Sequence, residues 1–79
     1  MHEFKFPKID GEKTGENIRR ICKEKGFTVY DVQDALFVGS NQAIYNWMNG
    51  KSFPSVETFH ALATLLGVTM EELIVIEKN

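Results

Sequence analysis

The chain has 79 residues, 43% of them hydrophobic and 25% charged, which is enough for one compact domain and too few for two. Its single cysteine excludes an internal disulfide and favours a reducing, cytoplasmic environment. The sequence has no apolar stretch approaching the roughly 18 residues of a membrane span, and the N-terminus lacks the apolar core of a signal peptide. We therefore expect a soluble cytoplasmic protein with no membrane partner.

The formal net charge of −2 is unusual for a nucleic-acid-binding protein, but the charges are unevenly distributed. Residues 53–79 hold four glutamates against one lysine, whereas residues 14–52 hold five basic side chains against four acids. Residues 35–52 contain no acid. A surface built from that last segment can approach phosphate groups without repulsion.

The N-terminal third of the chain predicts an irregular arm followed by a helix. Residues 1–13 contain a proline and a glycine and show no sustained period, and the alternating Phe4 and Phe6 indicate an extended piece that docks on the domain. Residues 14–79 then form the domain. Its first helix is expected over residues 15–25, with Thr14 as its cap and Gly26 as its left-handed stop.

The middle of the chain predicts two short helices separated by a break of about four residues. Thr28 and Asp31 resemble a capping box that begins a helix over residues 29–36. After the break, Ser40 is a suitable cap for a helix over residues 41–49, which Gly50 ends. So short a connection forces the two helices to cross sharply.

The last third predicts two more helices. Pro54 breaks the chain, Ser55 caps a helix that continues to Leu66, and Thr69 with Glu72 forms a second capping box. In the final short helix we expect Leu73, Ile74 and Ile76 to turn inward. With no convincing strand and no internal repeat, the sequence predicts an all-α fold, a compact bundle of about five short helices.

The helix over residues 41–49 has two contrasting faces. A spacing of 100° per residue places Ile44, Trp47 and Met48 on one side and Gln42, Tyr45, Asn46 and Asn49 on the other. The second group is free of lysine and glutamate, the usual residues of a solvated face. Carboxamides can bond the N6 and N7 atoms of adenine together, so this face suits base recognition. Asn and Gln are also common on ordinary solvated surface, and this pattern alone leaves both interpretations open.

The order and spacing of three segments are characteristic of one family of proteins. The segments are TGENIRRICKEKGFTVYDVQDAL, SNQAIYNWMNGKSFPS and ETFHALATLLGVTMEEL. Together they make residues 14–73 resemble the Cro/phage-repressor (XRE) class of helix-turn-helix regulators. The resemblance implies a lambda-repressor-like fold and sequence-specific binding to double-stranded DNA, usually as a homodimer. It also implies transcriptional control, most commonly repression.

By position, the resemblance assigns two groups of DNA-binding residues. The start and outward face of the recognition helix match Ser40, Asn41, Gln42, Tyr45 and Asn46. The following loop, which commonly meets the sugar-phosphate backbone, matches Asn49, Lys51 and Ser52. Phosphate contacts fix register whereas base contacts specify sequence, so the two groups should respond differently to mutation.

The sequence departs from the family pattern at three positions. Val29 stands where the family often has a glutamine that grips a phosphate, Gln33 replaces a small residue, and Phe37 replaces the glycine of the turn. Because a non-glycine residue with positive φ is strained, we expect the turn to take another shape and the recognition helix to be shifted.

Other chemistry is not indicated by the sequence. There is no catalytic arrangement, phosphate-binding loop or Cys/His cluster with metal spacing, so we expect neither an enzyme, nor a cofactor, nor a metal site. Cys22 and Trp47 lie on apolar faces and are expected in the core. Four basic residues stay open between solvated surface and phosphate contact: Arg19, Arg20, Lys23 and Lys25.

A second class of function remains an alternative. The acidic C-terminal part and the apolar residues 73–76 are also typical of a protein-interaction module that contacts a protein partner. An antitoxin would combine both classes, because it binds a toxin as well as its own operator. Residues 73–76 are the candidate interface for a homodimer or for such a partner.

Overall fold

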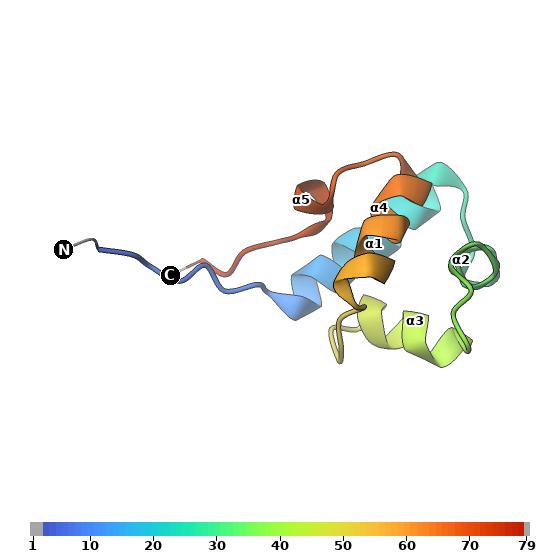
Figure 1. Cartoon of the computed structure of the whole chain (residues 1–79), viewed down its shortest axis with the longest axis horizontal. Helices are drawn as coiled ribbons and strands as arrows, with labels where there is room; N and C mark the ends of the chain where they lie inside the picture. The colour runs from blue at the N-terminus through green and yellow to red at the C-terminus, as the bar shows by residue number, and fades with distance from the viewer. Residues whose placement is uncertain (1–2, 79) are drawn as a thin grey trace.

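A computed structural model describes residues 3–78 and contains five α-helices in that range (Figure 1). They are α1 (Gly11–Lys25), α2 (Val29–Leu36), α3 (Asn41–Met48), α4 (Val56–Leu66) and α5 (Met70–Leu73). In residues 3–78 the only extended pairing is an isolated antiparallel bridge between Ile9 and Ile76. The prediction of an all-α bundle of five short helices is confirmed.

Four helices begin at the predicted side-chain caps. The hydroxyls of Thr28, Ser40, Ser55 and Thr69 each accept a hydrogen bond from the backbone N–H three residues later. Such a bond satisfies one of the N–H groups that a helix N-terminus leaves without an intrahelical partner. Both predicted capping boxes are present, with Asp31 and Glu72 bonding back to the cap backbone. Local sequence therefore determines where these four helices start.

The start of α1 differs from the prediction. The helix begins at Gly11, where Asp10 accepts a bond from the Lys13 N–H at 2.9 Å, and not at Gly15. Thr14, the expected cap, is only 1% exposed, and its Oγ1 accepts a hydrogen bond from the Val75 N–H at 2.9 Å. The Thr14 hydroxyl, which the local sequence assigned to a helix cap, therefore bonds to a residue 61 positions away. Residues 11–13, predicted as part of the arm, are helical.

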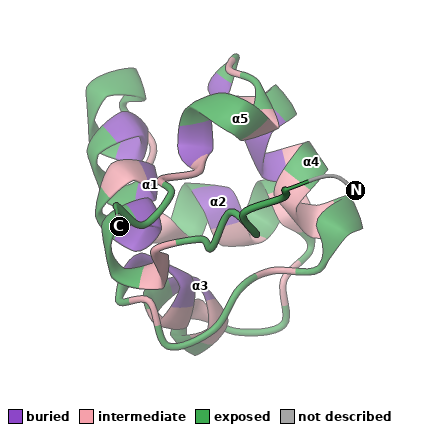
Figure 2. Ribbon diagram, turned by 90° about the vertical axis from the view of Figure 1, so that its left-hand side faces the viewer, coloured by how far each residue is buried: buried purple, intermediate pink, exposed green. Residues whose placement is uncertain are grey.

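The core lies between the helices: α1 packs against α3, α4 and α5, and α2 packs against α3 and α4 (Figure 2). Its largest fully buried apolar side chains are Ile44, Leu62, Leu66, Leu73 and Val32. Burying one such side chain contributes about 1.5–3 kcal/mol. Cys22 and Trp47 are buried as expected, and burial raises the pKa of the Cys22 thiol. Ile76 is 45% exposed, so the prediction that it turns inward was wrong.

An extended arm (residues 3–10) leaves the helical body beside the tail (residues 74–78), and both run away from the helices (Figure 1). The Asp10 N–H donates to the Val75 carbonyl and the Glu77 N–H donates to the Lys8 carbonyl, each at 2.8 Å. Phe4 is 77% exposed and Phe6 is 80% exposed. The expected docking of these rings on their own domain was wrong, because the bonds to the tail direct the arm outward. Residues 1 and 2 of the predicted arm lie outside the described residues.

Candidate nucleic-acid interface

The turn between α2 and α3 contains a strained residue. Phe37 has φ 54° and ψ 37°, in the left-handed region, and its ring is 94% exposed. The N–H groups of Phe37 and Val38 both bond to the Gln33 carbonyl, the same closure that a glycine would give. The expectation that Phe37 forces another turn shape was wrong, since the chain accepts the left-handed conformation, which costs about 1–2 kcal/mol. The fully solvated ring meets no steric obstacle there.

The buried side of α3 fixes the helix in the body. Ile44, Trp47 and Met48 are 0%, 8% and 5% exposed, as their spacing predicts. On the opposite side, Gln42 and Asn49 are exposed and Tyr45 is 40% exposed. The polar face is therefore free to meet another molecule.

Residues 40, 41 and 46 are less free than the sequence suggests. The Ser40 Oγ is engaged in the cap of α3, where it accepts from the Ala43 N–H at 3.4 Å. Asn41 is half-buried, and its Oδ1 is buried without a hydrogen-bond donor in the described part of the chain. Asn46 is also half-buried. These side chains line the edge of the face, while Gln42 and Tyr45 project from it.

Gln42 and Asn46 are coupled across one helical turn. The Gln42 Nε2 donates to the Asn46 Oδ1 at 2.9 Å. This bond leaves the Gln42 Oε1 as an acceptor and the Asn46 Nδ2 as a donor. An adenine edge in the major groove presents N7 as an acceptor and N6 as a donor. The pair therefore offers the complementary set in a pre-formed arrangement.

The loop that follows α3 is held against both α3 and α1. The backbone N–H groups of Lys51 and Ser52 donate to the Asn46 carbonyl at 2.9 and 3.4 Å. Gly50 has φ 74°, and a Cβ there would lie 2.7 Å from the Glu12 Cα. The close approach requires glycine at this position. It keeps the exposed side chains of Lys51 and Ser52 next to the end of α3.

Arg19 belongs beside this loop, although the sequence left its role open. Its Nη2 donates to the Asn49 Oδ1 at 3.1 Å. The two helices touch one turn earlier, where a Cβ on Gly15 would lie 2.5 Å from the Trp47 carbonyl oxygen. Arg19 lies four positions after Gly15 and shares its helix face, so the crossing at Gly15 brings Arg19 to the loop. The sequence carries no local signal for this role, because the burial of Gly15 depends on its contact with α3. Arg20 instead pairs with Glu24 at 2.9 Å.

A helix-turn-helix family model matches residues 18–73, a span that contains α2, the turn and α3. The chain belongs to this helix-turn-helix family. Its members of the XRE type are DNA-binding transcription regulators, not enzymes, so DNA-binding regulation is the function of this chain. No curated protein matches it in sequence.

Three solved regulators share the fold. The restriction-modification controller protein C.AhdI from Aeromonas hydrophila is 21% identical with a TM-score of 0.71, over 78% of this chain and 92% of that one. The clp gene regulator ClgR from C. glutamicum is 22% identical with a TM-score of 0.69, over 78% and 79%. A transcriptional regulator from Listeria innocua is 23% identical with a TM-score of 0.72 over 91% of this chain, which spans 64% of that protein.

In this helix-turn-helix protein, α2 contributes little side-chain chemistry to the interface. Val29 is half-buried and packs against the core, so it offers no polar group to a phosphate. The carboxylate of Asp31 is bound by the backbone N–H of Thr28 and by the Thr28 hydroxyl, and these bonds lower its pKa. The candidate interface therefore depends on α3 and the loop after it.

The structure also bears on metal binding and on membrane insertion. No group of three or more metal-ligating side chains comes together within residues 3–78. None of the helices described is long and apolar enough to cross a membrane.

Proposed function

We propose that this regulator is a cytoplasmic repressor that binds a specific double-stranded DNA sequence in the major groove, with α3 as the reading helix. The observation that carries this proposal is the Gln42–Asn46 pair on an exposed helix face within a segment, residues 35–52, that contains no acid. The buried free thiol of Cys22 agrees with a reducing cytoplasm.

The interface divides into readers and positioners. The readers are Gln42 and Asn46, whose paired carboxamides match an adenine, with Asn41 and Tyr45 beside them. The positioners are the phosphate-facing groups: Ser40, Asn49, Lys51, Ser52 and Arg19. The backbone N–H groups at the start of α3 add a partial positive charge toward a phosphate. Positioners fix the register in which the readers meet the bases.

Substitutions separate the two roles. Gln42→Ala or Asn46→Ala should lose about 1–3 kcal/mol of discrimination at one base pair, roughly 5–150-fold in relative affinity. Lys51→Ala should weaken all duplexes alike and reduce the slope of log affinity against log salt by about one. Lys78→Ala, which removes an exposed lysine of the tail, is the matched control, because the tail (residues 74–78) runs away from the helices (Figure 1). Unchanged sequence preference in both carboxamide variants would contradict the reading role.

We also propose that the regulator acts as a homodimer, because a module this small buries little DNA surface alone. The candidate interface, residues 73–76, has less exposed surface in the fold than the sequence suggested. Leu73 is 0% exposed within its own protomer, so only Ile76 and the half-buried Ile74 and Val75 have surface to offer. Sedimentation that finds only monomer, both free and on DNA, would remove the dimer from the proposal.

A further inference from the structure

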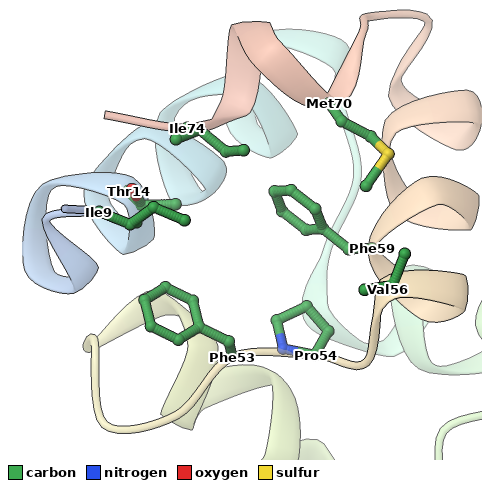
Figure 3. Close-up of a pocket in the computed structure, with 8 residues that line it drawn as sticks. All are labelled: Ile9, Thr14, Phe53, Pro54, Val56, Phe59, Met70 and Ile74. Atoms are coloured by element: carbon green, nitrogen blue, oxygen red, sulfur yellow. The ribbon is translucent and has the colours of Figure 1, made fainter. Parts of the chain in front are cut away.

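An apolar pocket of about 340 Å³ lies at the base of the extended arm (Figure 3). Six apolar side chains line most of it: Ile9, Phe53, Val56, Phe59, Met70 and Ile74. A cavity of about 150 Å³ holds one benzene ring, so this pocket has room for two aromatic rings. Its rim is open, since Phe53 is 54% exposed and Val56 is 79% exposed.

The extended arm carries two aromatic rings without a packing partner. Phe4 and Phe6 are 77% and 80% exposed, and a spacing of two residues places both on one face of an extended segment. Apolar side chains gathered on a projecting segment are typical of a contact with another molecule. Ile9 at the base lies five positions after Phe4, which gives the arm a reach of about 17 Å at about 3.3 Å per residue.

We propose that the arm of one copy inserts Phe4 and Phe6 into the pocket of a second copy, and that the exchange is reciprocal. The inference rests on the proposed homodimer and supplies its contact, but it does not depend on how α3 reads DNA. Within one copy, the bonds of Lys8 and Asp10 to the tail point the arm away from the helices (Figure 1). The rings are therefore presented outward, to another copy.

Symmetry and charge favour a second copy as the occupant. Each copy carries both an arm and a pocket, so one two-fold axis satisfies both contacts and the assembly closes at two. Residues 4–9 hold two lysines and no acid. Two exposed acids, Glu57 and Glu71, directly follow the pocket residues Val56 and Met70 in the chain. The arm and the segments that carry the pocket therefore differ in the sign of their charge.

Sedimentation equilibrium of the full chain without DNA tests the exchange. The wild type should be a dimer, and Phe4→Ser/Phe6→Ser should raise the dimer dissociation constant at least about tenfold, as expected for a central aromatic contact. Val56→Asp should do the same from the pocket side, and its high exposure keeps the fold intact. Tyr30→Ser, a 67% exposed aromatic on α2, is the matched control and should leave the constant unchanged.

A mixture of the arm variant and the pocket variant gives the sharpest readout. A heterodimer of the two retains one intact arm–pocket contact, so the mixture should associate more tightly than either variant alone. A monomeric wild type, or a dimer insensitive to the arm variant, would overturn the exchange. A concentration-independent loss of thermal stability in the arm variant would overturn it too, because the rings would then occupy their own pocket. Sequence-specific DNA binding that survives these results would leave the proposed DNA-reading function standing.

Discussion

The helical body and the extended arm treat apolar side chains in opposite ways. The body buries Ile44, Leu62 and Leu73 completely, whereas the arm leaves Phe4 and Phe6 more than three-quarters exposed. The body is thus closed around its own core, whereas the described part of the arm pairs with the tail through two backbone hydrogen bonds, which form a single bridge. This difference indicates that the body buries its apolar side chains within one copy, whereas the arm leaves its two aromatic rings available to another molecule.

The largest expected difference is in the free energy of unfolding, between the substitution of a core leucine and that of an arm phenylalanine. Leu62→Ala should lower the free energy of unfolding by about 2–5 kcal/mol, because it leaves a cavity among side chains that cannot fully collapse. Phe4→Ala should change it by less than about 0.5 kcal/mol in dilute protein, because its ring is exposed. Urea denaturation measures both. A cost for Phe4→Ala equal to that of Leu62→Ala would contradict the division between body and arm.

A smaller change in the free energy of unfolding is expected for a substitution where α1 contacts α3. Alanine in place of a helical glycine normally stabilises by about 0.5–1 kcal/mol. At Gly15 the sign should reverse, with a loss of about 1–3 kcal/mol, because the new Cβ meets the Trp47 and Met48 carbonyls, which cannot rotate away. Gly39→Ala is the control, since a Cβ at Gly39 meets nothing within 4 Å. Thermal unfolding of both variants would show whether this crossing is as close as described.

Phe37 is the residue of the body that most resembles the arm, with an exposed ring and a strained backbone. Phe37→Gly should raise the free energy of unfolding by about 0.5–1 kcal/mol, because relief of the left-handed strain exceeds the added freedom of the unfolded chain. Phe37→Ala keeps the Cβ and should give no such gain. If alanine stabilised as much as glycine, the backbone strain would not be the cause.

The smallest effect concerns the cap of α2. Bonds from the Thr28 backbone and hydroxyl lower the pKa of Asp31, so its ionised form stabilises the folded state. That contribution is present above the ordinary aspartate pKa and disappears as the pH falls through the lowered one. The melting temperature of Asp31→Asn should therefore be below wild type near about pH 7 and approach it near about pH 2. Asp34→Asn removes the same charge without a cap and should show no such convergence.

Local signals in the sequence were enough for most of the fold. The hydroxyl caps at Thr28, Ser40, Ser55 and Thr69 and the left-handed stop at Gly26 act within a few residues, so they could be predicted from sequence. The buried face of α3 followed from its period. Together these signals predicted α2, α3 and α4 to within about a residue, and they predicted the start of α5 but not its end at Leu73.

The errors arose where distant segments meet. The cap of α1 was misplaced because Thr14 bonds to Val75, and the arm was expected on the body because its pairing with the tail is not local. The same reason hid Arg19, whose role depends on where α1 crosses α3. The DNA-binding residues stay a prediction, although the Gln42–Asn46 bond adds a geometry that the sequence did not contain.

The most direct test of the account is selection of the purified full chain against randomised duplex DNA, with affinities measured by fluorescence anisotropy at two salt concentrations. We predict an enriched palindrome with half-sites about 10–10.5 base pairs apart, or a multiple of that spacing. We also predict that the preference for this site persists as the salt concentration rises. Weak binding to all sequences that vanishes with salt would contradict this, and would mean that the exposed face of α3 meets a protein instead of base pairs.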